Sequence, residues 1–210
     1  WGYTFAGVWQ EDDVNAPFVD ANGQTNGKTN GEVYKVKPGN SKYVDVNKDG
    51  VYNDADQGII GCGQPTFNWG WNNTFNYKNF DFSFFVVGFH GFDIYNATHQ
   101  MGYNLIKSQQ MAGVTPMREL LNRWTPTNTN TDIPGFVKGG TENKDFFSTR
   151  FVENGSFIKM KSITLGYTLP EATCRSLGIN NLRVYASVQN PFHITKYSGL
   201  DPEATMGSPL

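Results

Sequence analysis

Residues 45–56 place oxygen-bearing side chains at the spacing of a calcium-binding loop. Aspartate and asparagine occupy alternate positions from Asp45 to Asp49, and Gly50 follows at position six. Calcium in proteins takes roughly six to eight oxygen ligands, and glycine at this position permits the sharp turn that gathers them. The sequence therefore predicts a calcium site with the following ligands: Asp45, Asn47, Asp49, the carbonyl of Val51, Asn53 and Asp56.

Position twelve of this loop departs from the usual pattern. It is Asp56 rather than glutamate, and the shorter side chain reaches less far toward an ion that it should grip with both oxygens. An Asx-rich turn is the alternative interpretation, because Asn, Asp and Gly are also the common residues of tight turns. No nucleophile or general base stands beside the loop in sequence, so a bound Ca²⁺ is expected to be structural.

Other residue patterns do not predict catalysis. His90, His99 and His193 lack the short spacings of a zinc site, and no serine stands in a G-x-S-x-G setting. The formal net charge is −2, which gives no electrostatic reason to expect nucleic acid as a partner. The sequence predicts that the chain is not an enzyme and binds no nucleic acid.

The stretch Phe67–Tyr77 alternates aromatic side chains with Asn, Gly and Thr. Because successive side chains of a strand point to opposite faces, this pattern gives one aromatic face and one polar face. Aromatic residues make up 15% of the chain, and indole and phenol groups are better suited to a lipid–water interface than to a dry core. No apolar run reaches the roughly 20 residues of a membrane helix. The pattern therefore favours a strand of a transmembrane β-barrel.

Five segments alternate in this way at about the length of a tilted membrane strand. They are Trp1–Gln10, Thr66–Tyr77, Phe80–Phe92, Phe157–Leu169 and Leu182–Pro191. Lys78 and Asn79 alone join the second to the third, whereas residues 11–65 and 93–156 are long connections. Because outer-membrane barrels have short periplasmic turns and long outer loops, we expect both long connections to be extracellular. The predicted lumen-facing residues are Asn68, Asn72, Asn76, Arg183, Tyr185, Ser187 and Gln189.

Six phrases occur in a fixed order along nearly the whole chain. They are PGNSKYVDVNKDG (38–50), IGCGQPTFNWG (60–70), YKNFDFS (77–83), RWTPTN (123–128), ENGSFIKMKSITLGYTLP (153–170) and YSGLDPE (197–203). In this order they resemble the C-terminal barrel region of the SusC/RagA family of TonB-linked outer-membrane transporters. The resemblance implies an all-β fold in which residues 1–210 are part of an antiparallel barrel of about 22 strands. It also implies that the plug, the early strands and the final strand lie outside this sequence.

The same resemblance implies an importer of oligosaccharides or peptides in the cell outer membrane. The implied partners are a SusD-like surface lipoprotein, TonB through the N-terminal part, outer-membrane lipid and a glycan or peptide ligand, with Ca²⁺ as a structural cofactor. The residues alone leave a second interpretation open, a secreted β-sandwich that binds carbohydrate and is stabilised by calcium. This alternative predicts a closed soluble core, with the aromatic side chains turned inward or onto a flat binding face.

Overall fold

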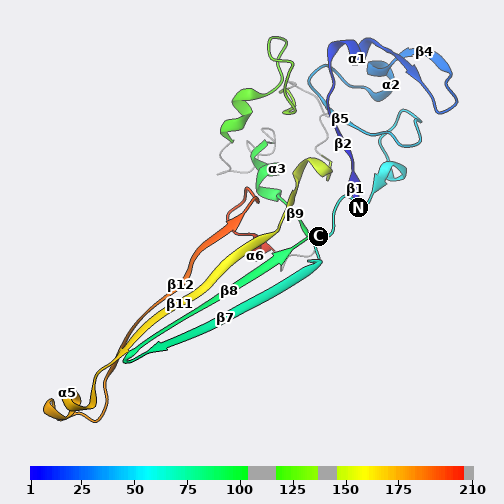
Figure 1. Ribbon diagram of the computed structural model, residues 1–210. Coiled ribbons are helices and arrows are strands. Elements are labelled where there is room, and N and C mark those ends of the chain that lie inside the picture. Colours follow the sequence, from blue (N-terminus) through cyan, green and yellow to red (C-terminus); the bar gives the residue numbers. More distant parts are fainter. Residues whose placement is uncertain (104–116, 137–145, 206–210) are drawn as a thin grey trace. The chain divides into compact units, whose positions relative to one another are not determined.

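The computed structural model of the chain describes residues 1–103, 117–136 and 146–205 (Figure 1). The chain divides into two compact units. The loop unit comprises Trp1–Gly61 and Tyr95–Val152, and the sheet unit comprises Cys62–Ile94 and Glu153–Leu210. Each unit buries hydrophobic side chains of its own.

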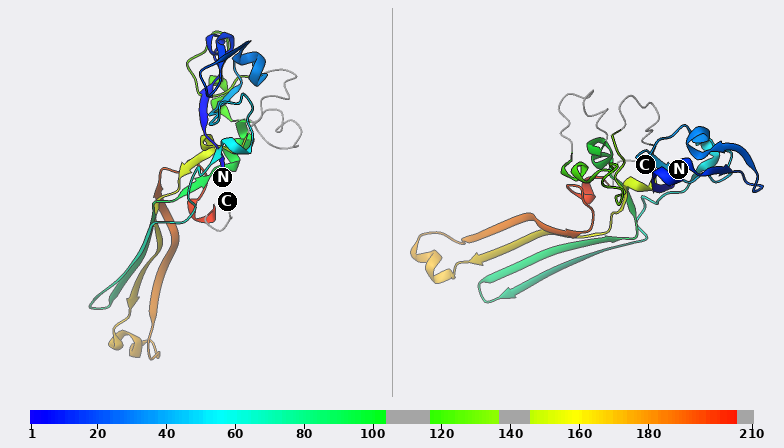
Figure 2. Two further views of the ribbon diagram at one scale, coloured as in Figure 1. Left: turned by 90° about the vertical axis from the view of Figure 1, so that its right-hand side faces the viewer. Right: turned by 90° about the horizontal axis from the view of Figure 1, so that it is seen from above.

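The sheet unit is built on four long antiparallel strands, which are neighbours in the order β12–β11–β8–β7 (Figure 2). Lys78 and Asn79 form the turn between β7 and β8, where Lys78 takes a φ of 53°. Four of the five predicted strands are therefore confirmed, and so is the short turn between the first two of them. The strands are β7 (Phe67–Tyr77), β8 (Phe80–His90), β11 (Phe157–Thr168) and β12 (Arg183–Thr195).

The strand register divides this sheet into an apolar face and a polar face. Directly paired residues share a face, so Trp71, Val86 and Met160 lie on the same side. The apolar face includes Trp69, Trp71, Phe75, Phe82, Phe84, Ile163, Leu165, Val184 and Val188. The polar face includes Ser83, Ser162, Thr164 and all the predicted lumen-facing residues, namely Asn68, Asn72, Asn76, Arg183, Tyr185, Ser187 and Gln189.

A β-bulge interrupts β11 near its start. The register of β11 shifts between Met160 and Ser162 against both of its neighbours. Against β8 the shift leaves Lys161 as an extra residue, whereas against β12 it sets Lys161 opposite two residues, Asn190 and Pro191. An extra residue reverses the alternation on one side of a bulge. Phe157 and Lys159 consequently share the polar face with Ser162, although their parity in the sequence differs.

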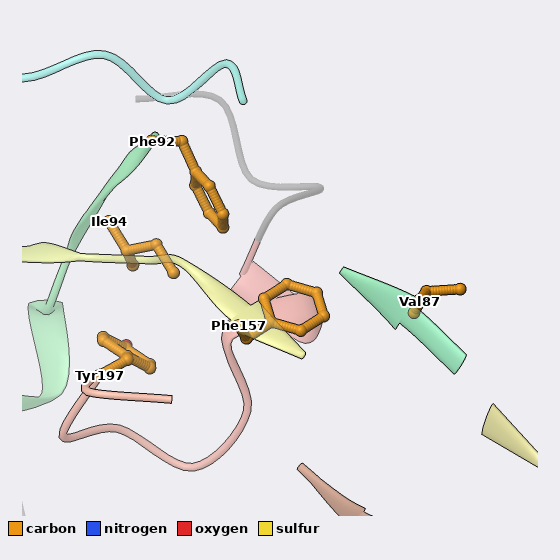
Figure 3. Close-up of a cluster of buried hydrophobic side chains, with 5 residues drawn as sticks. All are labelled: Val87, Phe92, Ile94, Phe157 and Tyr197. Atoms are coloured by element: carbon orange, nitrogen blue, oxygen red, sulfur yellow. The ribbon is translucent and has the colours of Figure 1, made fainter. Parts of the chain in front are cut away.

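The hydrophobic core of the sheet unit lies at the end of the strands away from Lys78 (Figure 3). Phe157 is 1% exposed, and its ring centroid lies 5.2 Å from that of Phe89. The other buried members are Val87, Phe92, Ile94 and Tyr197. Two short helices complete the unit, α5 (Glu171–Ser176) between β11 and β12, and α6 (Pro202–Thr205) after β12.

Short elements make up the loop unit, and no helix in the described part of the chain is long and apolar enough to cross a membrane. The strands pair two by two: β1 (Gly2–Tyr3) with β6 (Gln57–Gly58), β2 (Phe5–Val8) with β5 (Ser41–Tyr43), and β3 (Pro17–Val19) with β4 (Thr25–Thr29). The helices and 3₁₀ turns are α1 (Glu11–Asn15), α2 (Asn30–Tyr34), η1 (Asp54–Asp56), α3 (Ala97–Tyr103), η2 (Arg118–Asn122) and η3 (Thr149–Phe151). The division between the units falls within β9 (Asp93–Tyr95) and within β10 (Val152–Asn154).

The prediction of a membrane strand over Trp1–Gln10 is wrong. This stretch forms the two short strands β1 and β2, and Gly7 takes a φ of 112° beside a register shift in the pairing with β5. Trp9 is only 4% exposed and Tyr3 only 7%. The alternation in this stretch therefore reflects packing inside a small protein core, not contact with lipid.

Candidate functional site

The predicted calcium loop lies in the loop unit between β5 and β6, and its side chains fold back onto its own backbone. The backbone N–H of Gly50 donates to Asp45 Oδ2 at 2.8 Å. The N–H of Asp49 donates to Asn47 Oδ1 at 3.1 Å, and that of Val51 donates to Asp49 Oδ1 at 2.8 Å. Gly50 has a φ of 81°, which glycine adopts without strain. The side chains at positions one, three and five are thereby held within a single turn.

Among the predicted ligands, Asp45 has the side-chain oxygen best suited to bind a cation. Its Oδ2 accepts hydrogen bonds from Gly50 and from the Tyr34 hydroxyl at 2.8 Å. Its Oδ1 is buried and has no hydrogen-bond partner among the residues that the structure describes. A buried carboxylate oxygen without a partner is costly, and a bound cation would satisfy it. This atom therefore fits the role of a calcium ligand.

Asp56 closes the loop by hydrogen bonds. Its side chain is buried, with Oδ1 accepting from the N–H of Val46 at 2.8 Å and Oδ2 from that of Asn53 at 3.0 Å. These two hydrogen bonds hold the end of the loop in place without a bound ion. In the described ranges, no group of three or more His, Cys, Asp or Glu side chains is placed to hold a metal. The oxygen donors suit Ca²⁺ better at the Asp45 end than at the Asp56 end.

The charge at the centre of the loop is stabilised locally. The N–H of Val51, together with the Asn47 side chain, holds the pKa of the exposed Asp49 carboxyl below its ordinary value. Asp49 Oδ2 also accepts from the amides of Asn47 at 2.9 Å and Asn53 at 3.1 Å. The carboxylate is therefore ionised at neutral pH, as a cation ligand must be.

Three tyrosines lie around a cavity beside the loop, a feature that the sequence analysis missed. The rings of Tyr34 and Tyr52 stack with centroids 5.2 Å apart, and Tyr43 meets Tyr52 edge-on at 5.6 Å. The cavity measures about 220 Å³ and is also lined by Val51 and Phe146. Burial raises the pKa of Tyr52 to about 12, and burial and the hydrogen bond to Asp45 raise that of Tyr34. The only sequence signal was tyrosine recurring every nine residues in a polar stretch.

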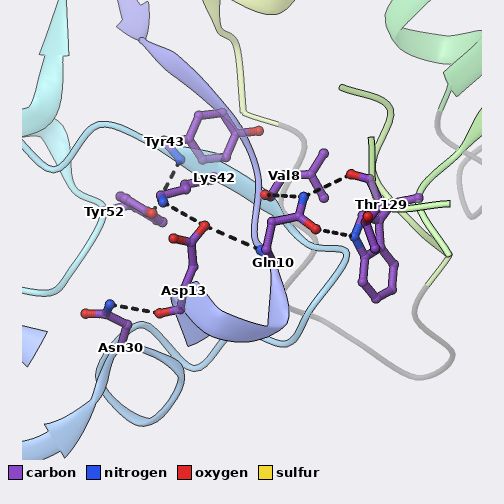
Figure 4. A network of polar contacts seen from close by, with 9 residues as sticks. Val8, Gln10, Asp13, Asn30, Lys42, Tyr43, Tyr52 and Thr129 are labelled. Atoms are coloured by element: carbon purple, nitrogen blue, oxygen red, sulfur yellow. Dashed lines mark hydrogen bonds and ion pairs between the residues drawn. The ribbon is translucent and has the colours of Figure 1, made fainter. Parts of the chain in front are cut away.

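A polar network joins distant parts of the loop unit (Figure 4). The Gln10 side chain accepts from the Trp124 indole N–H at 2.9 Å and donates to the Thr129 carbonyl at 3.3 Å. Lys42 Nζ lies 3.0 Å from Asp13 Oδ2 in the same network. Both ends of the Gln10 amide are thus engaged, and Trp124 is held as a packing residue of the loop.

The polar face of the sheet forms a second candidate site, a wall of amides and hydroxyls. Thr164 and Ser187 hydrogen-bond across β11 and β12 at 2.9 Å. Arg183 Nε lies 3.0 Å and its Nη2 2.5 Å from the two carboxylate oxygens of Asp81. This ion pair spans β11 above Gly166, where a Cβ would lie 2.5 Å from Arg183 Nη2. Glycine at this position therefore makes room for the pair.

The two faces define the class of protein, because an exposed aromatic face backed by a polar face is the arrangement of a barrel wall between lipid and lumen. On the apolar face, Trp71, Phe75 and Val184 are each more than half exposed. Within the sheet unit, the other described strand residues belong to β9 and β10, which form a short two-stranded pair. This arrangement contradicts the closed core that the secreted β-sandwich requires.

Sequence comparison identifies relatives among bacterial receptors, although no family model matches the chain. TonB-dependent receptor P3 of Formosa agariphila is 33% identical over 204 residues, which are 97% of this chain and 18% of that receptor. TonB-dependent receptor SusC of Bacteroides thetaiotaomicron is 32% identical over 173 residues, 81% of this chain and 16% of that receptor. The chain thus spans less than a fifth of the length of these relatives.

Solved structures agree with this relationship. The RagAB peptide transporter superposes with a TM-score of 0.64 over 97% of this chain and 20% of that chain, at 23% sequence identity. The RagAB peptide importer in its "open-open" state gives a TM-score of 0.63. The fold is thereby confirmed as an antiparallel transmembrane β-barrel segment. The chain belongs to the SusC/RagA family of TonB-dependent receptors and is a C-terminal portion of the barrel. The members of this family are receptors and not enzymes.

Proposed function

We propose that the chain forms part of the wall and the outer loops of a TonB-dependent importer in the outer membrane. The division of the sheet into an exposed aromatic face and a polar face is the observation that carries this proposal. Lipid would contact the aromatic face, and a solvated lumen would contact the amides and hydroxyls. The edge strands β7 and β12 need further strands beside them, because open sheet edges are not tolerated in lipid.

The proposed cargo is an oligosaccharide or a peptide, captured beneath a SusD-like surface lipoprotein. In support, one relative is named SusC and the similar solved structures are titled as a peptide transporter and a peptide importer. Ligand would be held between the lipoprotein and the barrel, and TonB would then displace the plug by acting on the N-terminal part of the whole receptor. Residues 11–65 and 93–156 would be the extracellular loops on which the lipoprotein sits.

The test uses the full-length receptor in its own host. We expect cells that lack the receptor gene to lose uptake of some member of a panel of fluorescent oligosaccharides and peptides. An uncoupler of the proton-motive force should abolish the same uptake in wild-type cells. A tagged receptor should also retain one defined surface lipoprotein through purification, and deletion of that lipoprotein should reduce the same uptake. Unchanged uptake of the whole panel in the deletion strain would contradict the proposal.

We also propose that residues 45–56 bind Ca²⁺ as a structural brace. The proposal is supported by the unpartnered Oδ1 of Asp45 and by the turn that gathers Asp45, Asn47 and Asp49. Calcium at about 100 times its dissociation constant would stabilise the folded loop by about 2.7 kcal/mol. The ion would add no chemistry beyond holding these oxygens together.

The double variant Asp45→Asn/Asp49→Asn tests this brace in the full-length receptor. Removal of calcium with a chelator should increase amide exchange in residues 41–58 of the wild type but leave the double variant unchanged. Asp54→Asn is the matched control, because Asp54 lies in the same loop at a position outside the predicted ligand set. Equal responses of wild type and double variant to the chelator would show that the loop is an ordinary Asx-rich turn.

A further inference from the structure

The segment that follows β12 is pinned to the polar face of the sheet. Tyr197 belongs to the same buried cluster as Phe157 and Val87, both of which lie on the polar face by register (Figure 3). The N–H of Tyr197 donates to Thr195 Oγ1 at 3.0 Å, which turns the chain as the strand ends. We call residues 197–205 the strap.

A buried lysine forms the main attachment of the strap. The Lys159 side chain is 7% exposed, and its Nζ lies 2.8 Å from Asp201 Oδ2 and 2.7 Å from Glu203 Oε2. Lys161, the extra residue of the bulge, pairs with the other oxygen of Glu203. Asp201 also accepts from the N–H of Glu203 at 3.0 Å, so that the two carboxylates are held together around the lysine.

A second attachment holds the beginning of the strap. Ser198 donates from its N–H to Glu153 Oε2 at 2.8 Å and from its hydroxyl to Glu153 Oε1 at 2.7 Å. Leu200 lies between the two attachments and is 97% exposed. Polar contacts thus fix the strap on both sides of a turn, and the apolar side chain at the turn stays exposed.

We propose that Lys159 locks the strap against the polar face and that the locked strap narrows the path of a ligand along this wall. The second half of this statement rests on the proposed import function. Lys159 is a positioning residue, because it acts through Asp201 and Glu203. A buried lysine without partners is strongly disfavoured, so loss of either side of the ion-pair cluster should release the strap. The bulge contributes to this attachment, because it brings Lys159 and Lys161 to the same carboxylate, that of Glu203.

Amide hydrogen exchange of the full-length receptor in lipid vesicles tests the lock. Lys159→Met should raise the exchange rate of residues 197–205 by about tenfold or more, because the methionine keeps the volume of the side chain but loses its charge. Lys161→Met is the matched control with a smaller expected effect, since Lys161 is more exposed and contacts only Glu203 of the pair. Lys159→Arg should restore most of the protection. Unchanged exchange in Lys159→Met, or a rise spread over the whole sheet, would overturn the lock.

Thiol labelling tests the narrowing of the path independently of import. In a Cys62→Ser/Cys174→Ser background, Gln189→Cys places a thiol on the polar face. N-ethylmaleimide, a small reagent, should label this thiol at the same rate whether residue 159 is lysine or methionine. A bulky maleimide–polyethylene glycol added outside the cells should label it faster in the Lys159→Met variant than in the protein that keeps Lys159. Equal labelling by the bulky reagent in both backgrounds would overturn the narrowing. Because neither readout requires import, failure of the import proposal would leave the result on the lock interpretable.

Discussion

Two aromatic stretches with the same alternating pattern occupy opposite environments. In the loop unit Trp9 is 4% exposed and packs against Tyr34, with ring centroids 5.4 Å apart. In the sheet unit Trp71 is 55% exposed and meets its strand neighbour Phe84 edge-on at 5.2 Å. The difference lies in what contacts each ring: Tyr34 and the Lys42 ammonium lie over Trp9, whereas Trp71 meets a residue of the adjacent strand in its own sheet. Alternation indicates which side chains share a face, but not what covers that face.

The largest expected effect is a difference in stability between variants of the two tryptophans, Trp9 and Trp71. Trp9→Ala should destabilise the loop unit by about 3–5 kcal/mol, the usual cost of emptying a large aromatic site in a core. Trp71→Ala should cost less, because that ring borders lipid and leaves no cavity in protein. The measurement is amide exchange of the β2 and β7 regions in the full-length receptor in vesicles. Equal losses at the two sites would mean that Trp71 is also a core residue.

A second prediction sharpens the contrast between the two faces of the sheet. Val188 and Ser187 are adjacent in β12 but lie on the apolar and polar faces respectively. Val188→Arg should destabilise the folded receptor in vesicles by about 2–4 kcal/mol if the position is near the bilayer midplane, whereas Ser187→Arg should cost much less. The measurement is reversible unfolding in denaturant, with abundance in the outer membrane as a second readout. A greater cost for Ser187→Arg would assign lipid to the opposite face.

Local sequence patterns were sufficient to predict the strands of the sheet and the tight turn at residues 45–50. Period-two alternation placed Asn72 and Trp71 on opposite faces, and the partner strand β8 alternates in the matching register from Phe80 to Phe84, so the two patterns agreed with the fold there. The Asp45–Asp49 spacing likewise predicted a turn that gathers its own side chains, because those contacts are only a few residues apart. Such contacts depend little on the rest of the chain.

Contacts between distant residues could not be predicted in the same way. Lys159 and Glu203 form an ion pair although they lie 44 residues apart in the sequence. Because of the bulge at Lys161, counting alternate positions along β11 assigns Lys159 to the wrong face of the sheet. The membrane strand predicted over Trp1–Gln10 failed for a related reason. Its aromatic side chains are covered by Tyr34 and Tyr43, which come from a stretch whose composition suggested only loops. The tyrosine cavity was missed because its wall comes from three separate elements, namely α2, β5 and the loop before η1.

A smaller effect is expected from a methyl group on either of two glycines of the polar face. Gly166→Ala should cost at most about 1 kcal/mol, because the new Cβ would push apart the partly exposed ends of Asp81 and Arg183 and weaken their ion pair. Gly70→Ala is the matched control, where the nearest atom is the rim of the Phe85 ring at 3.3 Å, which can yield. Thermal unfolding of the two full-length variants in the same detergent measures the difference. Equal melting temperatures would contradict the close approach at Gly166.

The smallest expected effect is a pH dependence of the strap, which β7, a strand without carboxylates, should not share. Burial opposes ionisation of the Asp201 and Glu203 carboxyls, but the hydrogen bonds and charge of Lys159 outweigh it and hold both pKa values below the ordinary 3.8 and 4.5. Depressed folded pKa values mean that the stabilisation is complete above about pH 4.5 and is lost as the pH falls through the folded values. The other titratable groups near these carboxylates are Lys159 and Lys161 in β11 and His193, which pairs with Lys159 from β12.

Amide exchange corrected for its intrinsic pH dependence should therefore show residues 197–205 losing protection below about pH 4, while residues 67–75 of β7, which include no carboxylate, keep theirs. Glu153, which accepts hydrogen bonds from Ser198, is a further carboxylate beside the strap, so Glu153→Gln serves as the control. Its strap should start less protected but still respond to pH. In Asp201→Asn/Glu203→Gln the response should be nearly absent, and a response as large as that of the wild type would assign it to groups other than the two carboxylates around Lys159.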